Sequence, residues 1–458
     1  MREPSASGTY RGLVLVPPVF LVASVTLVFG LLFGYSTAML AGVLDDVAGR
    51  FALDTPSTEA IVAVLVFSCF VGAILASPVS ARIGRRAALA IASLLAFGGY
   101  GAILAGPNLE VLVIARIAIG LAVGLSSMVA PMYAAEATAP RLRGAVVSIY
   151  QLAITIGILA AYAMPLFLSA LLAWYQLIGI GIIIGCLGLA VALAIPESPR
   201  WLSAKGRIAD AEAIARFLGV VDFAGHAGEH VEASGRRWTG LRIAFVGSVP
   251  MVLVMCGGLF ILQNLSGIDG ILYYAPKIFE ELGFDRGAAS LAATFLLGGV
   301  NVFATVGAIA VVDRLGRRPL LIVGSAFMIL GLSGVVTAHL TGSAMVGLAG
   351  LCLYIAAFAI SLGPLPYVMM SELFPSAIRE PGMAAASATS WLFNAMVAFY
   401  FLSAVQTFGS VMVFGFFTTI CLVTLLAGLA LMPETKGVTL DEIEAKVLAG
   451  KPLRHLGR

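Results

Sequence analysis

The chain has very little charge for its length. Aspartate, glutamate, lysine and arginine make up only 11% of its 458 residues, whereas apolar residues make up 60%. Two stretches, 144–196 and 381–433, contain no charged residue. An ordinary soluble domain carries about 25% charged residues, and none of this size would reach a mean hydropathy of +1.03. The scarcity of charge therefore excludes a soluble protein and predicts a polytopic membrane protein.

Cysteine and histidine are also scarce. The five cysteines stand singly in different apolar runs, without the spacing of a metal site or a disulfide framework. No nucleophile and base stand in a catalytic arrangement, so we expect no enzymatic activity, no cofactor and no metal. The net charge of +3 is small and gives no support for a nucleic-acid partner.

The chain does contain a series of apolar runs, each close to the ~20 residues that a helix needs to cross a bilayer. Each charge-free stretch is long enough for two such helices joined by a short loop. The predicted fold is therefore an all-α polytopic membrane protein with twelve transmembrane helices. The expected spans are 18–41, 59–80, 87–106, 111–134, 144–168, 171–195, 243–267, 288–312, 319–340, 344–370, 382–405 and 410–432.

The basic residues predict the orientation, because lysine and arginine are enriched in cytoplasmic loops. Nearly all of the 27 fall in the N-terminal arm, in the loops after even-numbered spans or in the C-terminal tail. The exceptions are Arg50, Arg116, Lys277 and Arg286. We therefore expect a multi-pass protein of the cell membrane with both termini in the cytoplasm. The acidic residues expected in a loop on the outer side are Asp45, Asp46, Asp54 and Glu59.

Three charged patterns recur in the same order and at nearly the same offset along the chain. They are an Arg-x-Gly-Arg-Arg loop, a glutamate followed by an arginine, and a Pro-Glu pair. The repeated positions are Arg82 and Arg314, Glu136 and Glu372, Arg143 and Arg379, and Glu197 and Glu434. Such a repeat indicates a duplicated six-helix unit. The expected parts are a first half at 1–196, a cytoplasmic linker at 197–242, a second half at 243–432 and a cytoplasmic tail at 433–458.

The linker contains one amphipathic pattern. Apolar residues recur at helical spacing from Ile208 to Leu218, and Gly219 follows as a stop. This predicts a short cytoplasmic helix. Its role stays open between a simple tether and a latch that holds the two halves together.

The stretch from Gln263 to Phe279 places amides, a carboxylate and two tyrosines inside an apolar span. A polar side chain that faces lipid costs several kcal/mol, so such residues usually face a bundle interior or a water-filled cavity. We interpret this stretch as one wall of a substrate site.

These patterns resemble the sugar porter family of the major facilitator superfamily, which includes bacterial proton-coupled xylose and glucose symporters and animal glucose facilitators. The resemblance covers nearly the whole chain. The matching motifs begin at Leu32, Arg82, Pro131, Pro196, Gln263, Arg314, Ser371 and Pro433. The resemblance implies two pseudo-symmetric halves in the major facilitator fold, with a monosaccharide (hexose or pentose) or related polyol bound between them and carried by alternating access.

The family's sugar site carries over residue by residue. Amides suit a sugar because they both donate and accept hydrogen bonds without charge, and aromatic rings suit its apolar faces. The residues implied for substrate binding are Gln151, Gln263, Tyr273, Asn301 and Trp391, which match the family, together with Asn264, Asp269 and Tyr367, which stand where the family has glutamine, asparagine and tryptophan. Taken singly, each amide is equally compatible with a hydrogen bond that joins two helices.

The resemblance also implies a cytoplasmic gate of charged residues that closes the inside when the outside is open. Its members are Arg82, Arg85, Glu136, Arg143, Glu197, Asp313, Arg314, Arg317, Glu372, Arg379 and Glu434. The alternative is that these charges only determine topology, since exposed ion pairs each contribute ~0–1 kcal/mol.

One departure from the family concerns proton coupling. Proton-coupled members carry an aspartate after Phe-Gly-Tyr in the first helix, where this chain has Ser36, while the partner arginine remains as Arg116. Asp269 stands at the pseudo-equivalent position of the second half, where the family usually has asparagine. We therefore take Asp269 and Arg116 as candidates for proton coupling. The alternative is that Asp269 binds sugar hydroxyls or a cationic substrate and transport is passive.

The predicted function is transport of a sugar across the cell membrane, either facilitated or proton-coupled. The alternatives are export of a cationic or drug-like molecule, and a non-transporting sugar sensor. The expected partners are the sugar, the lipid bilayer and, under coupling, protons, and we expect the chain to act as a monomer.

Overall fold

The computed structural model describes residues 17–220, 245–375, 378–438 and 440–457. These residues form helices and contain no strand. Twelve of the described helical segments are long and apolar enough to cross a membrane. The predicted all-α membrane fold is thus confirmed.

The helices of the first half pack in pairs. The pairs are α1 (Pro18–Ala38) with α6 (Pro140–Leu168), α3 (Thr55–Ile83) with α5 (Leu109–Ala137), and α4 (Arg85–Ala105) with α8 (Ile182–Ala194). Glycines let these backbones approach closely. A Cβ atom on Gly34 of α1 would lie 1.9 Å from the carbonyl oxygen of Ile154 on α6. Close contact through small residues is the usual way in which helices associate inside a membrane.

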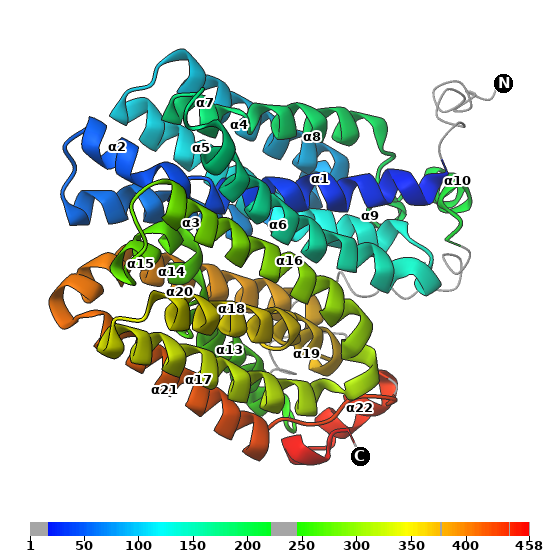
Figure 1. The fold of residues 1–458 in the computed structure, drawn as a ribbon. Helices are drawn as coiled ribbons and strands as arrows, with labels where there is room; N and C mark the ends of the chain where they lie inside the picture. The colour runs from blue at the N-terminus through cyan, green and yellow to red at the C-terminus, as the bar shows by residue number, and fades with distance from the viewer. Residues whose placement is uncertain (1–16, 221–244, 376–377, 439, 458) are drawn as a thin grey trace.

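The second half repeats these pairings. The pairs are α13 (Val249–Leu265) with α20 (Arg379–Phe408), α16 (Ala288–Leu315) with α18 (Ala344–Ile360), and α17 (Arg317–Thr341) with α21 (Ser410–Ala430). Figure 1 shows the two halves side by side, the first in blue to green and the second in green to red. The repeated charged patterns therefore correspond to a repeated three-dimensional unit.

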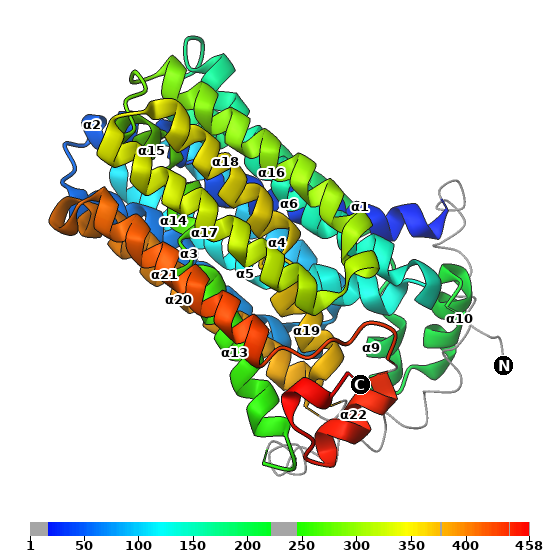
Figure 2. The ribbon, with the colours of Figure 1, turned by 60° about the horizontal axis from the view of Figure 1, so that its bottom comes forward.

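Short elements lie at the two ends of the bundle (Figures 1 and 2). The linker end, as we call it, holds α9 (Pro199–Ala204), α10 (Ile208–Leu218), α22 (Leu440–Leu448) and η4 (Leu453–His455). The far end holds α2 (Leu44–Arg50) and α15 (Ala275–Glu281). The remaining short elements are η2 (Ala41–Val43), α7 (Trp174–Gly179), α14 (Ile268–Tyr273) and α19 (Leu365–Leu373).

The amphipathic helix that the linker pattern predicts is present as α10, and Gly219 ends it in a left-handed conformation. The interpretation of Glu59 as a loop residue is wrong. Asp54 caps the start of α3 by accepting a hydrogen bond from the backbone nitrogen of Ser57, and this bonding lowers the pKa of Asp54. Since the helix begins at Thr55, Glu59 belongs to α3 and is only 1% exposed.

In the described part of the chain, two helix pairs make the most extensive contacts between the halves. α3 of the first half packs against α20 of the second, and α6 packs against α16. Figures 1 and 2 both show α6 and α16 side by side. The candidate site residues lie on these helices and on the broken helices next to them.

Candidate functional site

The span that contains the Gln263 stretch is broken in the middle. α13 ends at Leu265 and α14 begins at Ile268, with Gly267 between them at a φ of +90°. A Cβ atom at Gly267 would lie 2.3 Å from the Phe417 ring, so both the conformation and the space require glycine. A broken helix at membrane depth is typical of transporter binding sites.

Two amides stand at the end of α13. Gln263 donates through Nε2 to the carbonyl oxygens of Leu362 (3.0 Å) and Gly363 (2.8 Å). Asn264 donates through Nδ2 to the Phe260 carbonyl oxygen (2.7 Å) and to Ser390 Oγ (3.1 Å). Among the described residues, none donates to the side-chain oxygen of either amide. Both oxygens remain available to accept a hydrogen bond from a ligand.

Beyond the break, α14 brings Asp269 and Tyr273 to α20. The Tyr273 hydroxyl donates to Asn394 Oδ1 at 3.0 Å, and the Asp269 carboxylate lies beside the same asparagine. The Oδ2 atom of Asp269 is buried and has no hydrogen-bond partner in the described part of the chain. A buried acceptor without a partner costs about 1–3 kcal/mol. A ligand hydroxyl, a cation or a proton at this oxygen would remove that cost.

Sequence reasoning missed Asn394. This amide is only 8% exposed and stands three residues after Trp391, which places the two side chains on neighbouring positions of one helix face. Its position in an apolar run next to a predicted site residue was the signal that could have revealed it.

Aromatic rings line the region from both halves. Trp391 on α20 contacts Phe33 on α1, with ring centroids 5.1 Å apart. Tyr367 on α19 packs edge-on against Phe260, with centroids 4.8 Å apart, yet 46% of its surface is exposed. The Trp391 contact therefore joins the halves, and the exposed face of Tyr367 is open to a ligand.

The remaining predicted site residues lie on the pair of helices that joins the halves. Gln151 is an exposed residue of α6, and Asn301 of α16 is 7% exposed. Among the residues described, neither side chain is hydrogen-bonded to the amides around the break. Their role in binding stays a prediction.

Arg116 is buried without a carboxylate partner in the described part of the structure. It donates from Nε to the Ile61 carbonyl oxygen (2.7 Å) and from Nη2 to the Val62 carbonyl oxygen (3.1 Å), both on α3. Ser36, which stands where the proton-coupled family members have aspartate, bonds instead to the Tyr100 hydroxyl at 2.7 Å. The charge of Arg116 is therefore stabilised by backbone carbonyls.

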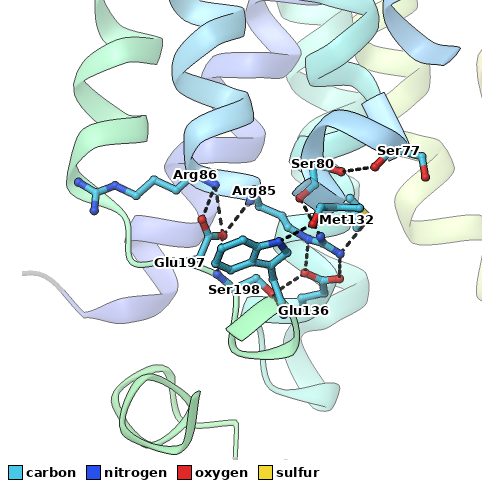
Figure 3. A network of polar contacts seen from close by, with 10 residues as sticks. Ser77, Ser80, Arg85, Arg86, Met132, Glu136, Glu197 and Ser198 are labelled. Carbon is cyan, nitrogen blue, oxygen red and sulfur yellow. Dashed lines mark hydrogen bonds and ion pairs between the residues drawn. The ribbon is translucent and has the colours of Figure 1, made fainter. Parts of the chain in front are cut away.

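At the linker end, the charged residues of the first half form one network (Figure 3). Arg85 donates to both carboxylate oxygens of Glu136 at 3.0 Å, and Ser198 Oγ donates to Glu136 at 2.5 Å. Glu197 accepts from the backbone nitrogens of Arg85 (2.8 Å) and Arg86 (3.3 Å) at the start of α4. A carboxylate at a helix N-terminus satisfies amide groups that the helix itself leaves free.

The second half repeats this network. Arg317 donates to Glu372 at 2.9 Å, Thr435 Oγ1 donates to Glu372 at 2.5 Å, and Glu434 accepts from the backbone nitrogens of Arg317 and Arg318 at 3.1 Å. The first network joins the first half to the start of the linker, and the second network joins the second half to the start of the tail.

Each Arg-x-Gly-Arg-Arg loop requires glycine at its third position. Gly84 and Gly316 adopt φ values of +95° and +92°. A Cβ atom would lie 2.2 Å from the Glu197 carboxylate at the first and 2.6 Å from the Glu434 carboxylate at the second. The loop motif and the Pro-Glu motif are therefore two parts of one contact.

Other predicted gate residues are placed differently. Arg82 and Arg314 are exposed. The side chains of Arg143, Asp313 and Arg379 lie outside the described residues. Whether any of these residues closes a gate stays a prediction.

At the far end, several contacts join the two halves. Glu59 on α3 accepts hydrogen bonds from Ser403 on α20, and Gln406 donates to Thr55 Oγ1 at 2.8 Å. Further contacts are the Lys277–Asp45 ion pair at 3.0 Å and the hydrogen bond from the Tyr162 hydroxyl to the Leu272 carbonyl oxygen at 2.7 Å.

A duplicated bundle with twelve candidate membrane spans among the described residues, one of them broken beside a cluster of polar side chains, is the architecture of a membrane transporter. The chain belongs to the sugar transporter family, because the family model described as "Sugar (and other) transporter" matches residues 22–447. It is similar to the galactose-proton symporter of Escherichia coli K12, with 35% identity over 448 residues that cover 96% of each chain. The D-xylose-proton symporter of the same strain is 34% identical over 472 residues, 93% of this chain and 95% of the relative.

Solved structures agree with this assignment. The partially occluded inward-open form of the xylose transporter XylE from E. coli has a TM-score of 0.79 and 31% identity, covering 93% of this chain and all of the other. XylE bound to 6-bromo-6-deoxy-D-glucose has a TM-score of 0.78 and 31% identity, covering 96% of this chain and 98% of the other. The major facilitator fold predicted from the sequence is thereby confirmed.

Proposed function

We propose that this protein carries a monosaccharide across the cell membrane by alternating access. The observation that supports it best is the group of amides around the break at Gly267. Among the described residues, none donates to the side-chain oxygens of Gln263 and Asn264, and the half-exposed Tyr367 lies on a neighbouring helix. Neutral amides next to aromatic rings suit a sugar, which offers hydroxyl groups around apolar faces. The names of the galactose and xylose symporters among the relatives support the same substrate class.

In this proposal the linker end faces the cytoplasm. The Arg-x-Gly-Arg-Arg loops and the linker helices lie there, and basic loops are retained on the cytoplasmic side. α1 begins and α22 ends at this side, which supports a cytoplasmic position for both termini. We further propose that the monomer is the transporting unit.

We also propose that transport is coupled to protons through Asp269. Its buried Oδ2 atom lacks a partner among the described residues, so adding a proton or a substrate hydroxyl there is favourable. We expect Arg116 to act only indirectly in proton coupling, because its guanidinium donates to backbone carbonyl oxygens of α3. Intramembrane carboxylates in transporters commonly act as proton relays.

The test is uptake of labelled galactose, xylose and glucose into proteoliposomes, with and without an inward proton gradient. Wild type is compared with Asp269→Asn and with the control Glu110→Gln, an exposed carboxylate at the start of α5. Under coupling, wild type and the control accumulate sugar only with the gradient, whereas Asp269→Asn merely equilibrates it.

Other outcomes favour the alternatives. If wild type equilibrates the sugar and ignores the gradient, the protein is a facilitator and Asp269 binds substrate. If no sugar moves under either condition, the free carboxylate oxygen of Asp269 favours a cationic substrate, and an amino sugar and organic cations become the next panel.

A further inference from the structure

Glu59 is a buried carboxylate that the proposed site does not use. It lies in the second turn of α3 at the far end and is 1% exposed. One carboxylate oxygen accepts from the backbone nitrogen of Ser403 at 2.8 Å, and the other accepts from the Ser403 hydroxyl. Both donors belong to α20 of the opposite half. We propose that Glu59 is a positioning residue of the transport cycle, which holds the two halves together at the far end through Ser403. This inference rests on alternating access as the proposed mechanism.

The bond to the Ser403 backbone requires a close approach of two helices. A backbone N–H inside a helix normally donates to the carbonyl group four residues earlier, and α20 continues for five residues beyond Ser403. An acceptor on α3 reaches this N–H only where the helices touch, and α3 and α20 do pack against each other. The contact therefore fixes the distance and the rotation of the two helices.

The surroundings make the contact costly to open. Arg116 of α5 faces this part of α3 and donates to the carbonyl oxygens of Ile61 and Val62. Tyr274 also faces it, and its hydroxyl donates to the Ala398 carbonyl oxygen at 2.7 Å. When the halves separate, the Glu59 carboxylate loses both donors and has to be hydrated. A buried charge without partners is strongly unfavourable, so the contact stays closed until water enters.

Hydrogen bonding and charge can be separated at this position. Glutamine has nearly the same shape as glutamate, and it accepts from the Ser403 N–H through Oε1 while donating to the Ser403 hydroxyl through Nε2. Leucine fills similar space and makes neither bond. Ser403→Ala keeps the backbone bond and removes only the hydroxyl.

The test measures distances between spin labels at both ends of the same two helices, without any sugar present. Labels replace the exposed residues Ser57 and Thr407 for the far end, and Ala81 and Ala385 for the linker end, in a background in which the five cysteines are replaced. The control variant is Thr58→Ala. Thr58 is 3% exposed on α3, but its hydroxyl bonds only within its own helix, to the Asp54 carbonyl oxygen.

We expect Glu59→Leu to raise the ratio of far-end-open to far-end-closed molecules by at least about tenfold, because bonds to a charged group are the stronger ones. Ser403→Ala shifts the ratio in the same direction by a smaller factor. Glu59→Gln shifts the ratio by less than Glu59→Leu, because it keeps two neutral hydrogen bonds, and Thr58→Ala keeps the wild-type distances. Linker-end distances shorten where far-end distances lengthen.

Two results would overturn the proposal. One is an unchanged far-end distance in both Glu59→Leu and Ser403→Ala. The other is a shift in Glu59→Gln as large as that in Glu59→Leu, which would assign the effect to charge alone. If Glu59→Leu does not fold, the far-end distances of Ser403→Ala and Glu59→Gln test the proposal instead. Because no sugar is used, these results are independent of whether the protein transports a sugar.

Discussion

Carboxylates at the two ends of the bundle make different kinds of contact. At the linker end, Glu136 and Glu372 each bind an arginine of their own half and a hydroxyl group of the segment that directly follows that half. At the far end, Glu59 binds a serine of the opposite half. In all three cases a carboxylate is surrounded by donors, but only the contact at the far end connects the two halves.

From this difference we expect the contacts at the linker end to persist during transport and those at the far end to open. Arginine–carboxylate pairs with two parallel bonds are strong and geometrically fixed, which suits contacts that keep each half rigid. Contacts between halves have to form and break in every cycle of alternating access, and the far end uses few of them. Rigid halves joined by a small number of polar contacts are what rocking requires.

Removing the arginine of a linker-end network should have the largest effect. Arg85→Ala leaves Ser198 as the remaining partner of Glu136 among the described residues, and the carboxylate is buried, since the Arg85 and Glu136 side chains are 12% and 6% exposed. Breaking such a pair costs about 3 kcal/mol, so we expect a clear fall in the thermal unfolding temperature in detergent. The exposed Arg82→Ala serves as the control.

The double variant Arg85→Leu/Glu136→Leu sharpens this prediction. Replacing both charges with apolar groups removes the unpaired carboxylate, so its unfolding temperature should lie above that of Arg85→Ala. Equal unfolding temperatures for the two variants would contradict a buried pair.

Filling the glycine contact inside the first half should have the next largest effect. Gly34→Val places a side chain where a Cβ atom alone would lie 1.9 Å from a backbone oxygen of α6, so α1 and α6 must separate. Overpacking of this kind costs about 1–3 kcal/mol. Gly98→Val, where no atom lies within 4 Å of the added Cβ, is the matched control. Equal thermal unfolding temperatures for the two variants would show that the close approach is not required.

Tyr162→Phe should weaken the contact between the two halves without unfolding either half. It removes the hydroxyl that donates to the Leu272 carbonyl oxygen at 2.7 Å, a bond worth about 1 kcal/mol. We expect a shift of about fivefold toward far-end-open molecules, measured with the label pair on Ser57 and Thr407. Tyr400→Phe should leave the distances unchanged, because Tyr400 is 59% exposed.

Lys277→Ala should have the smallest effect. The Lys277 and Asp45 side chains are 28% and 57% exposed, and exposed ion pairs contribute ~0–1 kcal/mol. The shift in the far-end distance should be small in low salt and should vanish near 1 M salt, where charges are screened within about 3 Å. A shift that persists in high salt would contradict a surface ion pair. Arg286→Ala is the control, because Arg286 pairs with Glu280 in its own half.

The sequence predicted the fold because the bilayer restricts it. Only helices satisfy their backbone inside a membrane, so apolar length alone predicted the spans. The duplicated charged patterns indicated the repeat, and the pattern that ends at Gly219 predicted α10. The amides and Asp269 were found because polar groups are rare in such segments.

Which residues meet one another was decided only by the tertiary structure. Sequence patterns did not reveal that the Gly84 loop makes room for Glu197, or that Asn394 stands beside Asp269. They also placed Glu59 in a loop, whereas it is buried against Ser403, 344 positions further along the chain. The sequence alone determined which segments cross the membrane, since each span depends on its own hydropathy. The partners depend on how distant helices pack, and a local pattern does not contain that information.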